Sequence, residues 1–231
     1  MALYVIADLH LSFGVNKPMD IFPGWENYEE KLYENWVSTV KEEDTVVIAG
    51  DISWAMDLNE AKADFEFIHK LPGKKIILKG NHEYWWSTVT KIEKFFKENG
   101  FDDIKLLHNN AYAVDGFAVC GSRGWLYNSE TNEDVKVLQR ELGRVERSII
   151  EAEKFELPIV CFLHYPPVYD GTACIEMIKL LKKHNVKECY FGHIHGTHAI
   201  KKAVMKEYGG VNLHLISGDY VKFMPVLIEK I

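Results

Sequence analysis

Five short motifs in the sequence are rich in aspartate, asparagine and histidine. They are Asp8-Leu9-His10, Gly50-Asp51, Gly80-Asn81-His82-Glu83, His164 and Gly192-His193-Ile194-His195. Taken singly, each has an ordinary structural explanation, since Asp and Asn also serve turns and helix caps and a lone histidine is often a hydrogen-bonded core residue. Taken together they predict a metal site, because gathering so many polar groups is costly unless cations neutralise their charge.

Each motif directly follows an apolar run with strand character. These runs are Leu3 to Ala7, Thr45 to Ala49, Lys75 to Lys79, Ile159 to Leu163 and Glu188 to Phe191, and similar runs occur at Ile104 to Leu107 and Phe117 to Cys120. In an open α/β sheet the carboxyl ends of the strands face one crevice, where ligands bind. We therefore expect the five motifs to meet in one place.

Segments with helical spacing alternate with the strands. They are Trp25 to Val40, Leu58 to Lys70, Trp85 to Asn99, Asn132 to Lys154 and Cys174 to Asn185. This alternation predicts an α/β protein with helices on both faces of the sheet. A hairpin is indicated by Asp115-Gly116 between two apolar runs, and Gly218-Asp219 between Val211 to Ser217 and Met224 to Ile228 looks similar. We expect mixed pairing in one sheet or two, and, with no linker or repeat, a single domain over residues 1–231.

Composition excludes several functional classes. The chain has 231 residues, of which 47% are apolar, and a formal net charge of −7. That charge argues against nucleic acid or an anionic membrane surface as a partner, and no apolar run approaches the roughly 20 residues needed to cross a bilayer. We expect no signal peptide, no obligate protein partner and a cytoplasmic location. The cysteines never form a C-x-x-C pair, which predicts buried free thiols at Cys120, Cys161, Cys174 and Cys189.

The five motifs, in this order, resemble those of the calcineurin-like metallophosphoesterase family. The resemblance implies a four-layered α/β/β/α sandwich with mixed sheets and a dinuclear metal centre at the strand ends. It also implies that Asp8, His10, Asp51 and His195 hold one metal ion, and that Asp51, Asn81, His164 and His193 hold the other. Asp51 would bridge the two ions.

The implied activity is hydrolysis of a phosphomonoester or phosphodiester by attack of a metal-bound hydroxide. Two divalent ions can bind the phosphoryl oxygens and stabilise both attack and departure. Imidazole ligands suit manganese, iron, nickel or zinc better than magnesium, and we expect manganese. His82 matches the family histidine outside the metal shell and would assist the leaving group. Glu83 either orients His82 or is a solvated carboxylate at a helix start.

Some features depart from the family pattern or favour another class. Trp54 stands three residues after Asp51, where many relatives have an acid or an amide, and the longer signature of protein Ser/Thr phosphatases is absent. The segment His193-x-His195-x-x-His198 is similar to a metallo-β-lactamase motif, but Thr197 stands where that motif needs Asp. A catalytically weak protein-binding scaffold of the same fold is the alternative function, disfavoured because every ligand is retained.

Substrate contacts outside the motifs are open at this stage. Arg123, in Gly121-Ser122-Arg123-Gly124, either reaches a substrate phosphate or pairs with one of the many carboxylates. Asn81 is a second candidate for substrate binding. Five of the six tryptophans lie beside the motifs, and they either stack on a flat leaving group such as a nucleoside or pack loops onto the sheet. We expect a small phosphorylated substrate, with a nucleotide as one candidate. The tryptophans in question are Trp25, Trp54, Trp85, Trp86 and Trp125.

Overall fold

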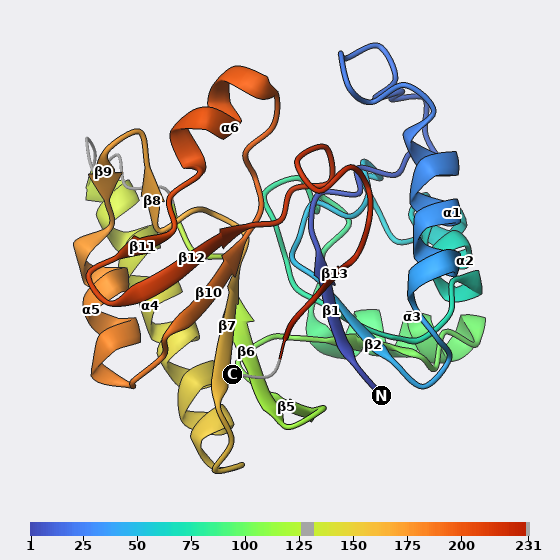
Figure 1. Ribbon diagram of the computed structural model, residues 1–231. Coiled ribbons are helices and arrows are strands. Elements are labelled where there is room, and N and C mark those ends of the chain that lie inside the picture. Colours follow the sequence, from blue (N-terminus) through green and yellow to red (C-terminus); the bar gives the residue numbers. More distant parts are fainter. Residues whose placement is uncertain (126–131, 230–231) are drawn as a thin grey trace.

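Short apolar runs form two main β-sheets that pack face to face in the computed structural model of the chain, which describes residues 1–125 and 132–229. Helices α1, α2 and α3 cover the outer face of one sheet, and α4 and α5 cover the outer face of the other (Figure 1). The order of layers is therefore α/β/β/α. This confirms the architecture that the family resemblance implied.

The first sheet has the strand order β13-β1-β2-β3-β4. Its strands β1 to β4 run parallel, and β13 pairs antiparallel with β1. Covered on both faces, these strands are nearly continuous apolar runs, as buried parallel strands usually are. Their bounds are Leu3–Ile6 for β1, Thr45–Ile48 for β2, Lys74–Ile77 for β3, Ile104–Leu106 for β4 and Val226–Leu227 for β13.

The second sheet has the order β11-β12-β10-β7-β6-β5, with four parallel central strands and an antiparallel strand at each edge. The predicted hairpin at Asp115-Gly116 joins β5 to β6 and is confirmed. Strands β8 and β9 form a separate short hairpin. The bounds are Tyr112–Val114 (β5), Phe117–Ser122 (β6), Ile159–Leu163 (β7), Val168–Tyr169 (β8), Thr172–Ala173 (β9), Glu188–Phe191 (β10), Glu207–Tyr208 (β11) and Val211–Leu215 (β12).

Three apolar clusters fill the spaces between the layers. The central cluster joins residues of the first sheet, such as Val5 and Val47, to residues of the second, such as Val160 and Phe162. The two sheets therefore share one core. The helices that complete the layers are α1 (Tyr28–Thr39), α2 (Lys62–Lys70), α3 (Val89–Asn99), α4 (Asn132–Glu153), α5 (Ile175–Lys183) and α6 (Thr197–Ala203). Among the described residues, no helix is long and apolar enough to cross a membrane.

Three helices begin later than their apolar spacing predicts. Asn27 adopts a left-handed backbone with φ of 53°, so α1 cannot begin before Tyr28. Thr88 accepts the backbone N–H of Lys91 and caps α3, which leaves the preceding tryptophans in a loop. Helix α2 begins at Lys62 rather than Leu58. In each case apolar loop residues packed on the sheet extended the helical pattern.

The prediction of a C-terminal hairpin around Gly218-Asp219 is wrong. Strand β12 lies in the second sheet, whereas β13 pairs with β1 in the first, so the chain crosses between the sheets (Figure 1). At the crossing, a Cβ atom on Gly218 would lie 2.9 Å from the carbonyl oxygen of Asp8. The turn residues thus pack against the first motif instead of closing a hairpin.

Candidate metal centre

The five motifs meet where the parallel strands of both sheets end. Asp8 and His10 follow β1, Asp51 follows β2, and Asn81 follows β3 in the first sheet, while His164 follows β7 and His193 and His195 follow β10 in the second. Two groups form there, Asp8/His10/His195 and Asp51/His164/His193, and in each group one ligand atom per residue lies within 4.8 Å of the others. This convergence is the one that strand-end positions predicted.

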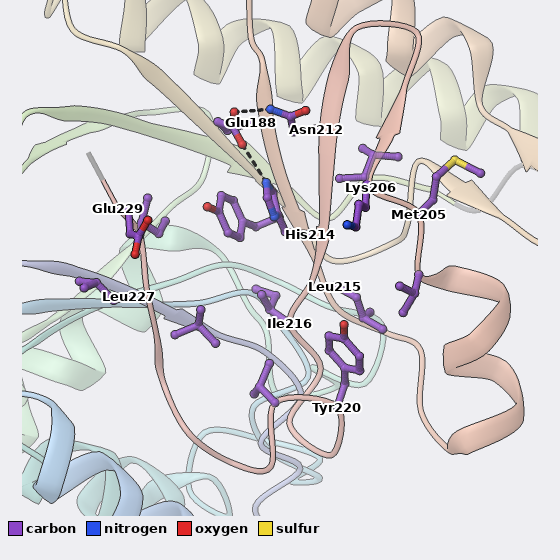
Figure 2. A pocket seen from close by; sticks show the side chains of 16 residues that line it. Glu188, Met205, Lys206, Asn212, His214, Leu215, Ile216, Tyr220, Leu227 and Glu229 are labelled. Carbon is purple, nitrogen blue, oxygen red and sulfur yellow. Dashed lines mark hydrogen bonds and ion pairs between the residues drawn. The ribbon is translucent and has the colours of Figure 1, made fainter. Parts of the chain in front are cut away.

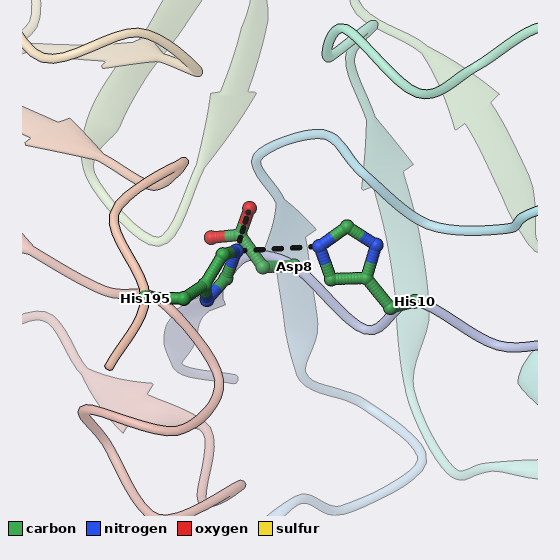
Figure 3. A group of neighbouring side chains, drawn as sticks. All are labelled: Asp8, His10 and His195. Carbon is green, nitrogen blue, oxygen red and sulfur yellow. Dashed lines mark hydrogen bonds and ion pairs between the residues drawn. The ribbon is translucent and has the colours of Figure 1, made fainter. Parts of the chain in front are cut away.

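In the first group, side chains from the ends of β1 and β10 point toward one another (Figure 3). The Nε2 atom of His195 lies 3.3 Å from Asp8 Oδ1 and 3.2 Å from His10 Nε2. Asp51 Oδ2 lies 3.8 Å from His10 Nε2. The side chain of Asp51 therefore also approaches this group.

In the second group, an amide oxygen lies between two imidazoles. Asn81 Oδ1 is 2.7 Å from His164 Nε2 and 2.8 Å from His193 Nδ1. Asp51 Oδ2 is 3.3 Å from the same His164 nitrogen. Asp51 thus stands between the two groups, which is the place a bridging carboxylate would occupy.

Backbone strain is concentrated at these side chains. Asp8, His10, Asp51 and His193 have φ values of 61°, 45°, 51° and 73°, in the left-handed region that side chains other than glycine seldom adopt. Such conformations cost on the order of 1–3 kcal/mol each and cluster at functional sites. The neighbouring glycines are also constrained, because a Cβ atom on Gly192 would lie 2.5 Å from the Asp8 carboxylate. The strand ends are shaped to aim these side chains, at a cost in stability.

The electrostatics of the crevice favour positive charge. Burial opposes ionisation of Asp51, yet neighbouring histidines, His164 first, lower its pKa below the usual range. The same balance lowers the pKa of Asp8, with His195 as its main partner. Burial likewise disfavours charge on these two histidines, but Asp51 and Asp8 raise the pKa of His164 to about 9 and of His195 to about 10. Burial dominates at the other two imidazoles and lowers the pKa of His10 and His193 to about 4.

The residues fit divalent cations. Two imidazole nitrogens, on His10 and His195, face each other at 3.2 Å, and the other ring nitrogen of His10 is buried without a hydrogen-bond partner among the described residues. Carboxylate, imidazole and amide donors together form a set that suits first-row divalent ions. Outer partners also orient the rings, since His164 Nδ1 lies 3.1 Å from the Ala49 carbonyl oxygen.

Asp219 is a partner of the site that the sequence interpretation did not assign. Its Oδ1 atom lies 3.2 Å from His195 Nδ1, and its Oδ2 atom accepts the backbone N–H of Gly196 at 2.7 Å. A carboxylate of this kind fixes the orientation and tautomer of a ligand histidine. The sequence did contain a signal for this role, because Gly218-Asp219 follows an apolar strand in the same way as Gly50-Asp51.

His82 lies beside the two groups without belonging to either. Its Nε2 atom is 3.9 Å from Asp51 Oδ2, and its side chain is 30% exposed. Its backbone N–H donates to Asp51 Oδ1 at 2.8 Å, and its ring lies 4.3 Å from that of Trp54. Burial lowers the pKa of His82, with Asp51 opposing. The ring is therefore held at the edge of the crevice and is partly open to solvent.

Glu83 has neither of the two roles considered for it. It is buried, and its carboxylate accepts the backbone N–H groups of Ile52 and Gly80. These two bonds tie the segment after β2 to the segment after β3, directly behind Asp51 and Asn81. Burial and repulsion from Asp51 raise the pKa of Glu83 to about 8. The sequence could not show that this carboxylate points inward.

Arg123 is partly buried and pairs with a carboxylate, which was one of the two roles that the sequence left open for it. Its Nη2 atom lies 3.3 Å from Glu141 on α4, and its guanidinium stacks 4.9 Å from the centre of the Trp125 ring.

The tryptophans divide between roles. Trp25 and Trp54 line a cavity of about 540 Å³ beside His10, His82 and His195, whereas Trp85 is buried against Phe65. We call the first space the aromatic cavity; Met19, Phe22 and Pro23 complete its apolar wall.

A cavity larger than the aromatic cavity, of about 680 Å³, lies elsewhere. It is lined by β10, β12 and the C-terminal segment, with His214 bonded to Glu188 at its centre (Figure 2). Tyr190 stacks on His214 at 4.4 Å. None of the motif residues lines this space, so its size does not mark the reaction centre.

The chain belongs to the calcineurin-like phosphoesterase family, whose sequence model matches residues 1–197. An uncharacterized protein of Methanocaldococcus jannaschii is 28% identical over 128 residues, which are 52% of this chain and 67% of that protein. With the two candidate metal groups, family membership supports a phosphoesterase with a dinuclear divalent metal centre.

Solved structures share the fold. A protein of unknown function from Aquifex aeolicus has a TM-score of 0.55 and 18% identity, covering 98% of this chain and 95% of that one. A phosphopantetheinyl hydrolase from Mycobacterium tuberculosis has a TM-score of 0.55 and 14% identity, covering 99% and 96%. A Thermus thermophilus protein has a TM-score of 0.55 and 14% identity, covering 85% and 84%. At these identities the likeness establishes the fold alone.

Proposed function

We propose that this protein hydrolyses a phosphomonoester or phosphodiester in a reaction that depends on two divalent metal ions. The observation that carries the proposal is the position of Asp51 between two groups of potential ligands at one edge of both sheets. A binding scaffold would not need strained backbone at four of these side chains.

Seven side chains would hold the ions. Asp8, His10 and His195 would bind one, Asn81, His164 and His193 the other, and Asp51 both. When bound, the ions would supply Lewis acidity and a nucleophile at neutral pH. Manganese is our proposed metal, with iron, zinc and nickel as alternatives, because magnesium seldom binds so many imidazoles.

His82 would act on the leaving group. As the P–O bond of the ester breaks, its oxygen takes up the bonding electron pair and needs a proton, which a protonated His82 ring can donate. The ring stands outside both ligand groups, close to Asp51, and is partly open to solvent. Burial lowers the pKa of the ring and so disfavours its protonated form, and Asp51 partly offsets this effect. The attacking water supplies the hydroxyl group that phosphorus gains as the ester bond breaks, and the other proton of that water restores the protonated form of His82.

The aromatic cavity favours a small substrate with a flat or apolar leaving group. Trp54 is half-buried and stands beside His10 and His82, so a group attached to the reacting phosphate can pack against its indole ring, and the buried Trp25 completes the wall. A nucleotide fits this description. We also propose a cytoplasmic location, supported by four buried cysteines that are free thiols.

The test is hydrolysis by purified protein that has been stripped with a chelator and reloaded with Mn²⁺, Zn²⁺, Fe²⁺, Ni²⁺ or Mg²⁺. The substrates are p-nitrophenyl phosphate, bis-p-nitrophenyl phosphate and inorganic pyrophosphate. We expect turnover of at least one ester, highest with Mn²⁺ and lost in Asp51→Asn. Two tightly bound metal ions without turnover of any ester would overturn the proposal and favour the binding scaffold.

A further inference from the structure

A second, strongly basic cavity lies beside the metal centre. It has a volume of about 230 Å³ and is lined by Lys79, Arg123, Val137, Arg140, Glu141 and Arg144. Four of these side chains are cations and one is an anion, although the whole chain carries a net charge of −7. We call this space the basic cavity.

One buried carboxylate organises the basic cavity. Glu141 is 1% exposed and accepts hydrogen bonds from Ser122 Oγ at 3.0 Å, Arg123 Nη2 at 3.3 Å and Arg144 Nη1 at 2.6 Å. These bonds fix two guanidinium groups in place but neutralise only one positive charge. One excess positive charge is therefore held in a defined geometry on Arg123 and Arg144, and Lys79 and Arg140 add two charges that Glu141 does not fix.

One donor of the basic cavity lacks a partner among the described residues. The Nε atom of Arg123 is buried and has no hydrogen-bond partner in the part of the chain that the structure describes. A buried unsatisfied donor on a charged group costs free energy unless a ligand meets it. Guanidinium groups match the oxygens of a phosphate in fork geometry, and Lys79 adds a point charge.

The basic cavity adjoins the second ligand group. The carbonyl oxygen of Arg123 accepts the backbone N–H groups of His164 at 3.0 Å and Tyr165 at 2.9 Å. The Tyr165 ring lies 4.4 Å from the ring of His193 and 5.4 Å from that of Trp125, on which Arg123 stacks. The Tyr165 side chain thus connects the basic cavity to the second ligand group. The aromatic cavity, in contrast, adjoins the ligand group of His10 and His195.

We propose that the basic cavity binds a second phosphate group of the substrate, so that the preferred substrates are small molecules with two separated phosphates. This inference rests on the proposed phosphoesterase function. One phosphate would react at the metal centre while the other is held by Arg123, Arg140, Arg144 and Lys79. The basic cavity would then select bisphosphorylated molecules over otherwise similar monophosphates.

The test measures binding without turnover. Alkane bisphosphonates with two to six methylene groups, and alkyl monophosphonates of the same lengths, are titrated calorimetrically into the Mn²⁺-loaded full chain. Their C–P bonds are not hydrolysed. We expect one bisphosphonate length to bind at least about tenfold more tightly than its matched monophosphonate, since hydrogen bonds to charged groups supply that much affinity.

The variant Lys79→Gln/Arg140→Gln removes two cations that do not bond to Glu141, and it should reduce this preference to less than about threefold while monophosphonate affinity is kept. The single variant Arg140→Gln, at an exposed position, serves if the double variant misfolds. The control Lys154→Gln/Lys183→Gln changes the net charge equally at two exposed pairs, with Glu151 and Glu146, and should keep the preference.

Equal binding of bisphosphonates and monophosphonates at every length would overturn the inference, as would an equal loss in the control. Failure of the phosphoesterase proposal looks different. In that case no ester is hydrolysed, whereas the preference for a bisphosphonate, and its loss in Lys79→Gln/Arg140→Gln, would still be seen.

Discussion

At the residue scale, Asp51 has the largest predicted effect on the metal centre. Its carboxylate lies 3.8 Å from His10 and 3.3 Å from His164, one histidine of each ligand group. Asp51→Asn removes a negative charge that both ions would share, so we expect metal content to fall at both positions together. Elemental analysis after gel filtration measures this, with the exposed Asp170→Asn as control. Two retained equivalents and unchanged activity would contradict the bridging role.

His82 should separate catalysis from metal binding. His82→Ala is expected to lower kcat by roughly 100-fold, the usual scale of general acid catalysis, and to leave metal content near normal. The loss should be larger for an alkyl phosphate than for p-nitrophenyl phosphate, because nitrophenolate departs without a proton. If the variant loses its metal ions instead, His82 is a ligand and the assignment fails.

Glu83 should stabilise the site through backbone contacts. Glu83→Gln replaces one acceptor oxygen with an amide NH2 group, which can only donate, so either the Ile52 or the Gly80 N–H group loses its partner inside the protein. A buried unsatisfied donor costs about 1–3 kcal/mol, and thermal unfolding should show a lower Tm. Glu98→Gln, at an exposed helix position, should leave Tm unchanged. Equal Tm values in the two variants would refute a stabilising role for the hydrogen bonds of Glu83 to Ile52 and Gly80.

At the scale of elements, Asp64 ties α2 to the loops that follow β1 and β2. Its buried carboxylate accepts the backbone N–H of Phe13 at 2.7 Å and the hydroxyl of Ser53. Burial raises its pKa to about 6, although both hydrogen bonds oppose the shift. The folded state therefore holds a proton between pH 4 and 6 that the unfolded chain has released.

This linkage predicts a pH-dependent loss of stability. Because the folded state binds more protons than the unfolded state in that window, the free energy of unfolding contributed by Asp64 is highest below pH 4 and falls as pH rises to 6. The change should be about 3 kcal/mol, since each unit of pKa difference is worth about 1.4 kcal/mol. The free energy of unfolding is measured with a denaturant across pH 4–7 for the wild type and for Asp64→Asn. The difference between the two curves is the contribution of Asp64. Parallel pH curves for the two proteins would show that this pKa is ordinary.

The longer strands were predictable from sequence, whereas the two-residue strands β8, β9 and β11 and the assignment of strands to sheets were not. Buried runs such as Ile159–Leu163 and turn residues such as Asp115-Gly116 are local signals, and both gave the right element. Strand β13 has only two residues, and its pairing with β1 depends on contacts more than 200 positions away along the chain. Helix starts failed where tryptophans packed on the sheet imitate a helical stripe, as before Thr88.

At the scale of the whole molecule, the positions of the motifs at strand ends were enough to predict that the candidate ligands meet. Parallel strands place their carboxyl ends at one edge of a sheet. What surrounds the ligands was not predictable. Glu83 lies in a motif and Asp219 follows a glycine after a strand, whereas Glu141 has no distinguishing local pattern. In all three cases only the fold shows what the carboxylate faces, which is Gly80 for Glu83, His195 for Asp219 and Arg123 for Glu141. Roles that depend on where a long side chain points need tertiary structure.

The crevice is asymmetric across the molecule, with indole rings beside one ligand group and guanidinium groups beside the other. Trp125 stacks on Arg123 and belongs to the basic side, and Trp25 is as buried as Trp85, so the ring that could stack on a base is that of Trp54. Stacking on an aromatic side chain is worth about 1–3 kcal/mol per base. It should act on KM for substrates with a flat group and leave other substrates unaffected.

Trp54→Ala should therefore raise KM for a nucleoside monophosphate by about tenfold and leave KM for an alkyl phosphate within about twofold. Trp85→Ala is the matched control, since Trp85 packs on Phe65 in the core, and it should lower Tm without changing the ratio of the two KM values. Equal KM changes for both substrates in Trp54→Ala would mean that the ring only shapes the loop around His82. A selective change would place the base on the side of His10 and leave the basic cavity free for a second phosphate.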